Sequence, residues 1–412
     1  MRRIVCIVAV VLLVVLSACG NNMKLTAQTT EDGSAILQNI YAPLTWEKIK
    51  AIPVANDDMT EQELRQICLD AFRLQLTFGW TPNIETYYHN SMHEKTFYPG
   101  EVYGGIPYNS RSFGNIYKWM YFYDEQTGVL DLSGGEATLA KICNQCTGGT
   151  LTGWSRVVNT ADYYGTNEMT HNAGCLRVGP YTYSDTIMGF GQRDTYTICA
   201  DNGALTMWES YAMLKPADGI VMYSNYENNG HVCMVASVEV VRFDDGKING
   251  QESFITYMDQ WAVYSSAVQE NGQPYEIQGR VDYKKSFQQV YDDGYLPFTF
   301  AELNKQDPVE KAEASITAGD DSVKLSELTL AQIDCNYIMS DITVSVTDAQ
   351  GKEVYRKDTI ISHMLMPKTT LLSTAISAKE LEPYADGAHT ITISTWVNTG
   401  EKLVAYSGLL TN

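Results

Sequence analysis

Asp218-Gly219-Ile220-Val221-Met222-Tyr223 and Gly230-His231-Val232-Cys233-Met234-Val235 are two apolar runs, and a short polar segment separates them. Their composition predicts two consecutive strands, with His231 at the start of the second. A third run, Phe254-Ile255-Thr256-Tyr257-Met258-Asp259-Gln260, follows a turn at Gly246. The sequence therefore predicts a group of neighbouring strands that carries one histidine and, at the end of the third strand, a carboxylate and an amide.

A cysteine beside small residues lies upstream, in Gln145-Cys146-Thr147-Gly148-Gly149. A thiol ionises readily at the start of a helix or beside an imidazolium, and the thiolate is the nucleophile of cysteine enzymes. The segment that Cys146 opens predicts a helix, although its glycines lower the helix propensity. The chain has six histidines, and His231 is the one that follows a glycine in a predicted strand pair. Cys146 and His231 are therefore the candidate nucleophile and base.

The third member of such a site is a polar side chain that fixes the tautomer of the imidazole. Asp259 and Gln260 end the strand that follows His231, so either one is a candidate, and we place Asp259 first. Both residues also fit an ordinary polar strand end.

The cysteines allow other interpretations. Cys146 forms a disulfide with Cys143 or Cys175 in one of them. In another, Cys143, Cys146, Cys175 and Cys199 bind zinc, although only the first pair has the spacing of zinc ligands. A redox role for Cys143-x-x-Cys146 lacks a surrounding thioredoxin-like pattern. The chain has no phosphate-binding or dinucleotide-binding glycine motif, and we predict neither a cofactor nor a metal.

The N-terminus has the features of an export signal. Met1-Arg2-Arg3 is charged, and Ile4–Leu16 is an apolar run that is short for a membrane span. Leu16-Ser17-Ala18-Cys19 resembles the lipobox of bacterial lipoproteins; the alternative is an ordinary signal that ends in cysteine. The resemblance implies cleavage before Cys19, a lipid on Cys19, and an extracytoplasmic protein anchored to the bacterial membrane.

The net charge and the number of cysteines agree with this extracytoplasmic location. Loss of residues 1–18 makes the formal charge of −20 more negative by two, and an acidic surface disfavours nucleic acid as a partner. Of nine cysteines, Cys6 leaves with the signal and Cys19 carries the lipid. The odd number that remains leaves at least one thiol free or paired outside the chain.

Composition divides the chain into four parts. They are a lipoprotein signal peptide at 1–18, a flexible tether at 19–45, a catalytic domain at 46–305 and a β-sandwich domain at 306–412. Thr60 and Glu63 have the capping-box spacing before a helix predicted over about 61–78. Residues 80–200 are rich in Tyr, Gly and Asn, which is typical of a loop scaffold.

Short β-prone runs with regular turns predict an Ig-like β-sandwich in the C-terminal part. These runs are Ser322–Leu325, Ile342–Val346, Lys352–Asp358, His389–Val397 and Leu403–Ser407.

Together, the motifs resemble the NlpC/P60 and CHAP group of papain-like cysteine peptidases and amidases. The resemblance rests on Pro216–Val221, on Gly230-His231-Val232, on the hairpin that ends in Asp259-Gln260, and on Gln145-Cys146-Thr147-Gly148. Gly105-Ile106-Pro107-Tyr108 resembles the tyrosine-bearing segment that precedes the cysteine in that group. The likeness covers roughly residues 95–265. The chain departs from the group at Gln145, where Asp is common, at Asp218-Gly219, where Gly-Asp is usual, and in the long interval between Cys146 and His231.

The resemblance implies an α+β fold, with a papain-like domain of helices and an antiparallel sheet followed by the sandwich. It implies a lipid-anchored cysteine hydrolase of the cell envelope, a peptidase or amidase with peptidoglycan or a peptide as substrate. Cys146 is then the nucleophile, His231 the base, and Asp259 or Gln260 the orienting group. The Tyr108 hydroxyl and the backbone N–H of Cys146 would bind the oxyanion. The alternative is a non-catalytic surface lipoprotein that uses the same scaffold for binding or adhesion.

Overall fold

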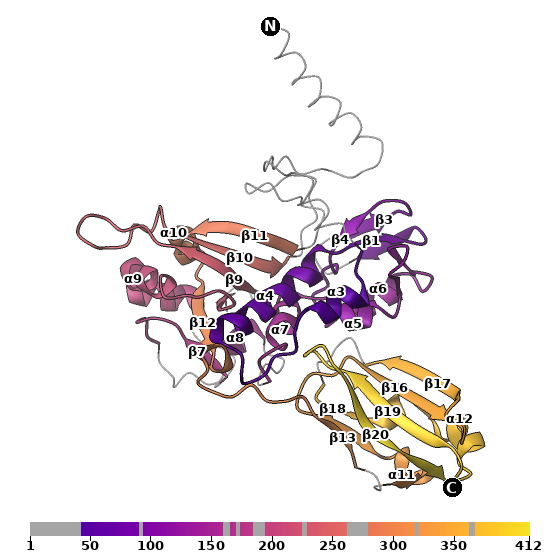
Figure 1. The fold of residues 1–412 in the computed structure, drawn as a ribbon. Coiled ribbons are helices and arrows are strands. Elements are labelled where there is room, and N and C mark those ends of the chain that lie inside the picture. The colour runs from indigo at the N-terminus through magenta and orange to yellow at the C-terminus, as the bar shows by residue number, and fades with distance from the viewer. Residues whose placement is uncertain are drawn as a thin grey trace, which may run out of the picture.

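The computed structural model describes residues 43–89, 94–159, 165–169, 174–183, 194–224, 229–261, 279–317, 321–361 and 367–412. The predicted signal peptide, Cys19 and nearly all of the predicted tether lie outside these residues. Across the described ranges, none of the helices combines the length and the apolar character that crossing a membrane requires. The chain has an α+β fold with several sheets (Figure 1).

A six-stranded, wholly antiparallel sheet forms the centre of the larger part of the molecule. Its order is β11-β10-β9-β8-β12-β7. The strands are β7 (Cys175–Arg177), β8 (Gly219–Ser224), β9 (Asn229–Glu239), β10 (Phe254–Gln260), β11 (Gly279–Ser286) and β12 (Leu296–Phe300). The three predicted strands are therefore confirmed as β8, β9 and β10, and Gly246 lies in the turn between the last two with φ of 85°. The sequence did not indicate β7, β11 or β12.

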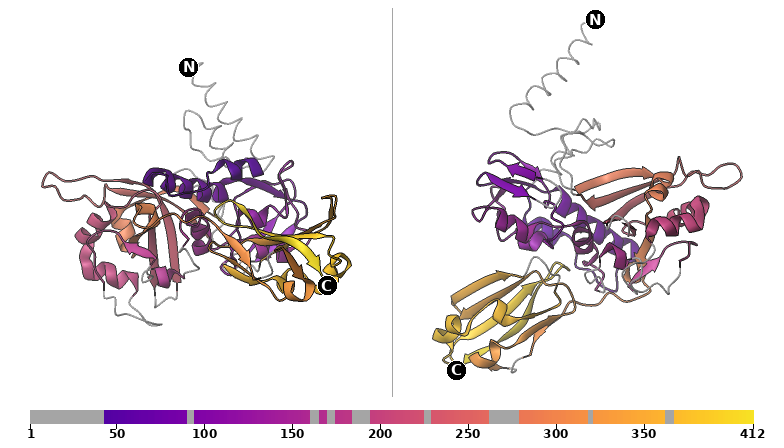
Figure 2. Two further views of the ribbon diagram at one scale, coloured as in Figure 1. Left: turned by 60° about the horizontal axis from the view of Figure 1, so that its bottom comes forward. Right: turned by 180° about the vertical axis from the view of Figure 1, so that it is seen from behind.

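Helices cover both faces of this sheet. On one side lie α4 (Glu61–Thr77) and α7 (Cys146–Trp154), and across the sheet lie α9 (Thr195–Tyr211) and α10 (Phe287–Asp292) (Figures 1 and 2). The short α8 (Thr166–Met169) lies against β8 and β9.

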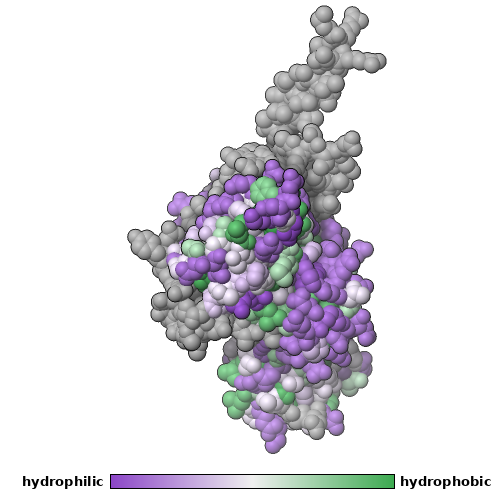
Figure 3. All heavy atoms as spheres, turned by 90° about the vertical axis from the view of Figure 1, so that its left-hand side faces the viewer, coloured by the Kyte–Doolittle hydropathy of each residue, from purple (hydrophilic) through white to green (hydrophobic). Residues whose placement is uncertain are grey.

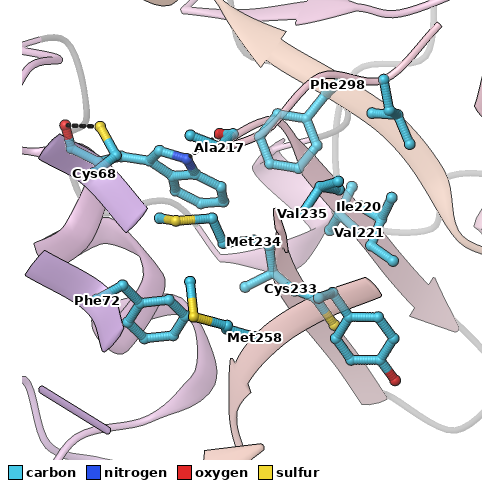
Figure 4. Close-up of a cluster of buried hydrophobic side chains, with 14 of the residues drawn as sticks. Cys68, Phe72, Ala217, Ile220, Val221, Cys233, Met234, Val235, Met258 and Phe298 are labelled. Atoms are coloured by element: carbon cyan, nitrogen blue, oxygen red, sulfur yellow. Dashed lines mark hydrogen bonds between the residues drawn. The ribbon is translucent and has the colours of Figure 1, made fainter. Parts of the chain in front are cut away.

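The predicted helix start at the capping box is confirmed in α4. The Thr60 side chain accepts from the Glu63 N–H, and the Glu63 carboxylate accepts from the Thr60 N–H. Phe72 of α4 packs with Met234 and Met258 of the sheet (Figure 4). The apolar face of α4 therefore belongs to the core.

The glycines of α7 allow close packing on the elements around it. A β-carbon at Gly153 would lie 2.8 Å from Cβ of Phe72 and 2.9 Å from Cε of Met234. One at Gly149 would lie 3.0 Å from Cβ of Gln260. The glycines thus lower the helix propensity of α7, but they allow α7 to pack closely against the sheet and α4.

Gly153→Ala is expected to lower the free energy of unfolding by up to about 2 kcal/mol. Alanine improves helix propensity by about 1 kcal/mol, but the extra methyl group overpacks the core at a cost of about 1–3 kcal/mol. Urea denaturation of the full-length chain measures the change. Gly153→Ala combined with Met234→Ala is expected to recover part of the loss relative to Met234→Ala alone. A Gly153→Ala variant more stable than the natural chain would contradict this packing.

A second, smaller assembly with its own core precedes α7. It contains α3 (Trp46–Ala51), α5 (Ile116–Trp119), α6 (Glu136–Ile142), the hairpin of β2 (Thr86–His89) and β3 (Glu94–Phe97), and a sheet of order β4-β1-β6-β5. The sheet strands are β1 (Gly79–Pro82), β4 (Tyr103–Gly104), β5 (Tyr123–Asp124) and β6 (Val129–Leu130). The region predicted as a loop scaffold, residues 80–200, is therefore partly made of short elements, and its end overlaps the start of the 17-residue α9.

Two further sheets share a separate core in the C-terminal part. One has the order β13-β15-β18 and the other β14-β20-β19-β16-β17. Their strands are β13 (Ala314–Ile316), β14 (Ser322–Lys324), β15 (Gln332–Cys335), β16 (Asp341–Thr347), β17 (Glu353–Ile360), β18 (Thr369–Leu371), β19 (Thr390–Trp396) and β20 (Lys402–Thr411). The helices α11 (Leu325–Leu328) and α12 (Ala378–Leu381) and the 3-10 turns Leu372–Thr374 and Glu382–Tyr384 accompany them, whereas the 3-10 turn Glu302–Asn304 follows β12 in the larger part. All five predicted runs are strands of the larger sheet, and the sequence did not indicate the smaller one.

The C-terminal sheets dock beside α5 and the end of α7 (Figures 1 and 2). The Asn115 amide donates to Oγ of Ser340 over 2.8 Å and to Oδ1 of Asn398 over 3.1 Å. Asn398 in turn donates to Oγ of Ser155, directly after α7, over 3.0 Å. The Trp396 ring stacks on both Trp46 and Tyr117. Buried polar bonds and stacked rings thus fix the two parts to each other.

The molecular surface is mixed on the side that lies at the left of Figure 1. Hydrophilic residues dominate that face, and apolar residues form separate spots (Figure 3). In the part of the chain that the structure describes, large apolar side chains such as Leu205, Met213 and Phe243 are exposed to solvent. Single exposed apolar side chains are normal in folded proteins and indicate no partner.

Candidate active site

Cys146 is the first residue of α7, where a thiolate is favoured. Gln145, the residue before the helix, makes no side-chain capping bond, so it does not occupy the N–H groups at this end. The helix dipole places partial positive charge there, which stabilises a negative sulfur. Cys146 is 5% exposed, so the thiol lies at the edge of the core rather than on the surface.

The Cys146 thiol lies close enough to the His231 imidazole for the two groups to interact. Burial raises the pKa of the Cys146 thiol, but the neighbouring His231 and its positive charge outweigh burial and hold the pKa below its usual value. Burial lowers the pKa of His231, yet the neighbouring Cys233, Asp259 and Cys146 raise it well above the usual range. Both directions favour a thiolate–imidazolium pair.

His231 is held by its strand and by its neighbours. It is the third residue of β9, and a β-carbon at the preceding Gly230 would lie 1.8 Å from Oγ1 of Thr166 in α8. Only glycine therefore lets α8 lie this close to the strand. The Trp261 ring meets the imidazole edge to face, with ring centroids 4.9 Å apart.

Asp259, and not Gln260, is the partner of the imidazole. Oδ2 of Asp259 lies 2.6 Å from Nε2 of His231, which leaves Nδ1 of the ring for the thiol. The Gln260 amide instead donates to the backbone oxygen of Ile106 over 2.6 Å. The order in which we placed the two candidates agrees with this geometry, and Gln260 tethers the segment that carries Tyr108.

Tyr108 lies close enough to the thiol for the two to interact electrostatically. Burial and the neighbouring Cys146 both raise the pKa of the Tyr108 hydroxyl, so it stays protonated and can donate a hydrogen bond. Its segment runs alongside Asn144, two residues before the cysteine. The structure thus brings all five predicted site residues into one region: Tyr108, Cys146, His231, Asp259 and Gln260.

Two charged or polar neighbours of Asp259 were missed in the sequence. Arg280 of β11 donates from Nε to Oδ1 of Asp259 over 2.9 Å and from Nη2 to Oδ2. The Cys233 thiol donates to the same Oδ2 over 3.7 Å. Burial raises the pKa of Asp259, but Arg280 and then His231 outweigh burial and hold the pKa well below its usual range. Asp259 is therefore a carboxylate at every pH at which the protein works.

The zinc and disulfide interpretations do not fit the described residues. The cysteines described there are all free, so Cys146 is not paired with Cys143 or Cys175. The group with metal-site geometry in this part of the chain consists of His231, Cys233 and Asp259, with ligand atoms within 4.8 Å of one another. Arg280 already binds both oxygens of that carboxylate, and its charge opposes a second cation. The geometry of this group is therefore accounted for by the bonds of Asp259 to His231 and Arg280.

Comparison of the chain with protein-family models, with curated proteins and with solved structures gives no match in any of the three.

Proposed function

We propose that this chain is a cysteine hydrolase that cleaves amide bonds, with a papain-like catalytic domain followed by an Ig-like sandwich. The observation that carries the proposal is that His231, hydrogen-bonded to Asp259, lies beside the Cys146 thiol. A thiol at a helix start, an imidazole on a strand and a carboxylate on the neighbouring strand are the three roles that acyl transfer requires.

Acylation follows from the state of the pair. The Cys146 thiolate attacks the carbonyl carbon of the amide and forms a C–S bond, and the carbonyl oxygen becomes an oxyanion. The backbone N–H of Cys146 and the Tyr108 hydroxyl are the donors proposed for that oxyanion. His231 then passes its proton to the leaving amine as the C–N bond breaks.

Deacylation uses the same groups in reverse order. Neutral His231 takes a proton from water, and the resulting hydroxide attacks the thioester carbon. The C–S bond breaks, the acid leaves, and Cys146 and His231 return to the ion pair. Asp259 holds Nε2 of the ring throughout, so that Nδ1 stays directed at the sulfur.

The substrate class is proposed from the cellular address. The N-terminal resemblance to lipoproteins supports an extracytoplasmic enzyme tethered to the membrane through Cys19, and peptidoglycan is the amide-rich polymer found there. The test is to incubate the full-length chain, purified in detergent, with peptidoglycan and to follow soluble fragments and new amino groups. Release of fragments that ends when Cys146 is alkylated is expected. No release, with Cys146 fully reactive, would favour the binding or adhesion function.

His231→Ala is expected to lower the rate at which iodoacetamide alkylates Cys146 by at least about tenfold near pH 6. The imidazolium stabilises the thiolate, and one unit of thiol pKa changes the thiolate fraction tenfold. Mass spectrometry of the Cys146 peptide in the full-length chain measures the rate. His389→Ala is the matched control, because His389 lies in the C-terminal part and pairs with Asp386. Equal rates in both variants would remove the basis for a catalytic pair.

A further inference from the structure

An irregularity of the strand register lies directly before Asp259. Along β10 and β11, Tyr257 pairs with Tyr283, whereas Asp259 pairs with Arg280. Strand β11 therefore has one extra residue over this interval, which is a β-bulge. In a regular ladder Asp259 would face Val281, and Arg280 would lie one residue further along with its side chain on the other face.

The bulge is fixed by a residue in an unfavourable conformation. Asp282 has φ of 56°, in the left-handed region that non-glycine residues rarely adopt. Its carboxylate is held from outside the sheet, because Arg73 of α4 binds it through both terminal nitrogens over 2.7 and 2.8 Å. Bulges next to active sites commonly redirect a side chain. Here the bulge brings the Arg280 fork opposite Asp259.

Arg280 is itself held rigidly. It is 7% exposed, its guanidinium lies 4.0 Å from the centroid of the Trp261 ring, and Trp261 also packs on His231. The Tyr283 ring covers it at 4.7 Å. The Arg280 guanidinium thus contacts both the Asp259 carboxylate and the Trp261 ring, and each of these two groups contacts the His231 imidazole.

We propose that Arg280 is a positioning residue of the hydrolase, which aligns Asp259 toward His231 and supplies the charge that keeps the whole site near neutrality. The inference rests on the proposed function. With Arg280 in place, the thiolate, imidazolium, carboxylate and guanidinium form two ion pairs in a buried region. Without it, the site carries one uncompensated negative charge, which a buried site disfavours.

The other titratable groups around Arg280 come from each strand near it. They are Asp259 and Tyr257 on β10, Tyr283 on β11, His231 and Cys233 on β9, and Tyr295 before β12. Burial raises the pKa of Tyr257, Tyr295 and Cys233, so these three groups are neutral near pH 7. Loss of the Arg280 charge therefore acts on the Cys146, His231 and Asp259 series.

The test is the pH dependence of Cys146 alkylation in the full-length chain. Arg280→Gln is expected to move the acid limb of the rate profile up by about one pH unit, because removal of a nearby cation raises the pKa of a thiolate. Arg280→Lys keeps the positive charge but loses the two-pronged guanidinium bond to Asp259. The acid limb of its alkylation profile should therefore stay near that of the natural chain, while its turnover of peptidoglycan should fall several-fold. Arg65→Gln is the matched control, since Arg65 is equally buried and pairs with Asp218 away from Cys146.

The outcomes separate this proposal from the proposed function, because alkylation needs no amide substrate. A shifted limb in Arg280→Gln and an unshifted one in Arg65→Gln support the role of Arg280 whether or not peptidoglycan is cleaved. An Arg280→Gln limb that coincides with that of the natural chain would overturn it even in an active hydrolase. Should Arg280→Gln fail to fold by circular dichroism, an Arg280→Lys variant with the turnover of the natural chain would overturn it instead.

Discussion

Asp259→Asn is expected to slow amide hydrolysis by about 10⁴-fold, the loss found when the acid of a catalytic triad is replaced by its amide. The carboxylate accepts from Nε2 of His231 and balances the imidazolium that forms during catalysis. An amide at this position removes the charge, and its NH₂ group can donate a hydrogen bond to Nε2 of His231. That bond favours the wrong tautomer of the imidazole. Turnover of peptidoglycan by the full-length chain measures the effect.

The same substitution has a cost in stability, because it leaves Arg280 buried without its anion. Removing one partner of a buried ion pair destabilises by about 3–5 kcal/mol. Activity must therefore be compared at a temperature at which circular dichroism shows the variant folded. Gln260→Met is the control: it loses the bond to the Ile106 oxygen but leaves the His231 partner intact, so less than a tenfold loss is expected. A larger loss in Gln260→Met than in Asp259→Asn would make Gln260 the orienting residue.

Local sequence patterns were sufficient to predict the elements that carry Cys146, His231 and Asp259. The capping box at Thr60 and Glu63 marks the start of α4, and apolar runs mark β8, β9 and β10. Periodicity within one strand does not tell which face is turned to a partner strand, because adjacent residues alternate between faces. That is why Asp259 and Gln260 remained alternatives until the register was known.

Arg280 was not predictable, because its place depends on a pairing between strands. The shift that sets it opposite Asp259 depends on one extra residue in β11 and on the backbone of Asp282, which follows no local pattern. The smaller C-terminal sheet was missed for a related reason. Its strands β13, β15 and β18 have three or four residues each, too few for a period to show. The helix α9 was missed because its apolar residues do not gather on one face and because it is interrupted at Gly203, which has φ of 75°.

A buried lysine beside the C-terminal sheets provides the largest gain in stability that we expect from a single substitution. The Lys118 side chain of α5 is 1% exposed, and its ammonium donates to the Phe113 backbone oxygen over 2.9 Å. Burial lowers the pKa of Lys118 from its usual 10.5 to about 7, and the nearby Asp341 opposes that change only in part. The folded chain therefore buries a charge whose solvation is incompletely replaced.

The sign of the pH dependence follows from the two pKa values of Lys118. Below pH 7 the folded and unfolded chains both carry the proton, so the full penalty of burying the charge applies. Between about pH 7 and 10.5 the unfolded chain keeps a proton that the folded chain has lost. Stability then rises with pH, as it does wherever the unfolded state binds more protons. Other groups also titrate there, so the Lys118 contribution is obtained as a difference from a variant that lacks the amine.

Lys118→Met is therefore expected to raise the free energy of unfolding by about 1–4 kcal/mol at pH 6, the range found when buried charges are replaced by apolar side chains of similar size. The gain should shrink steadily between pH 7 and 10, because the natural chain loses its buried charge over that interval. Urea denaturation of both chains at several pH values measures the difference. Lys141→Met, at an exposed position of α6, should give a small difference that does not vary with pH. A gain for Lys118→Met that stays constant from pH 6 to 10 would show that folding does not lower the pKa of Lys118, because the folded and unfolded chains would then bind the same number of protons over this interval.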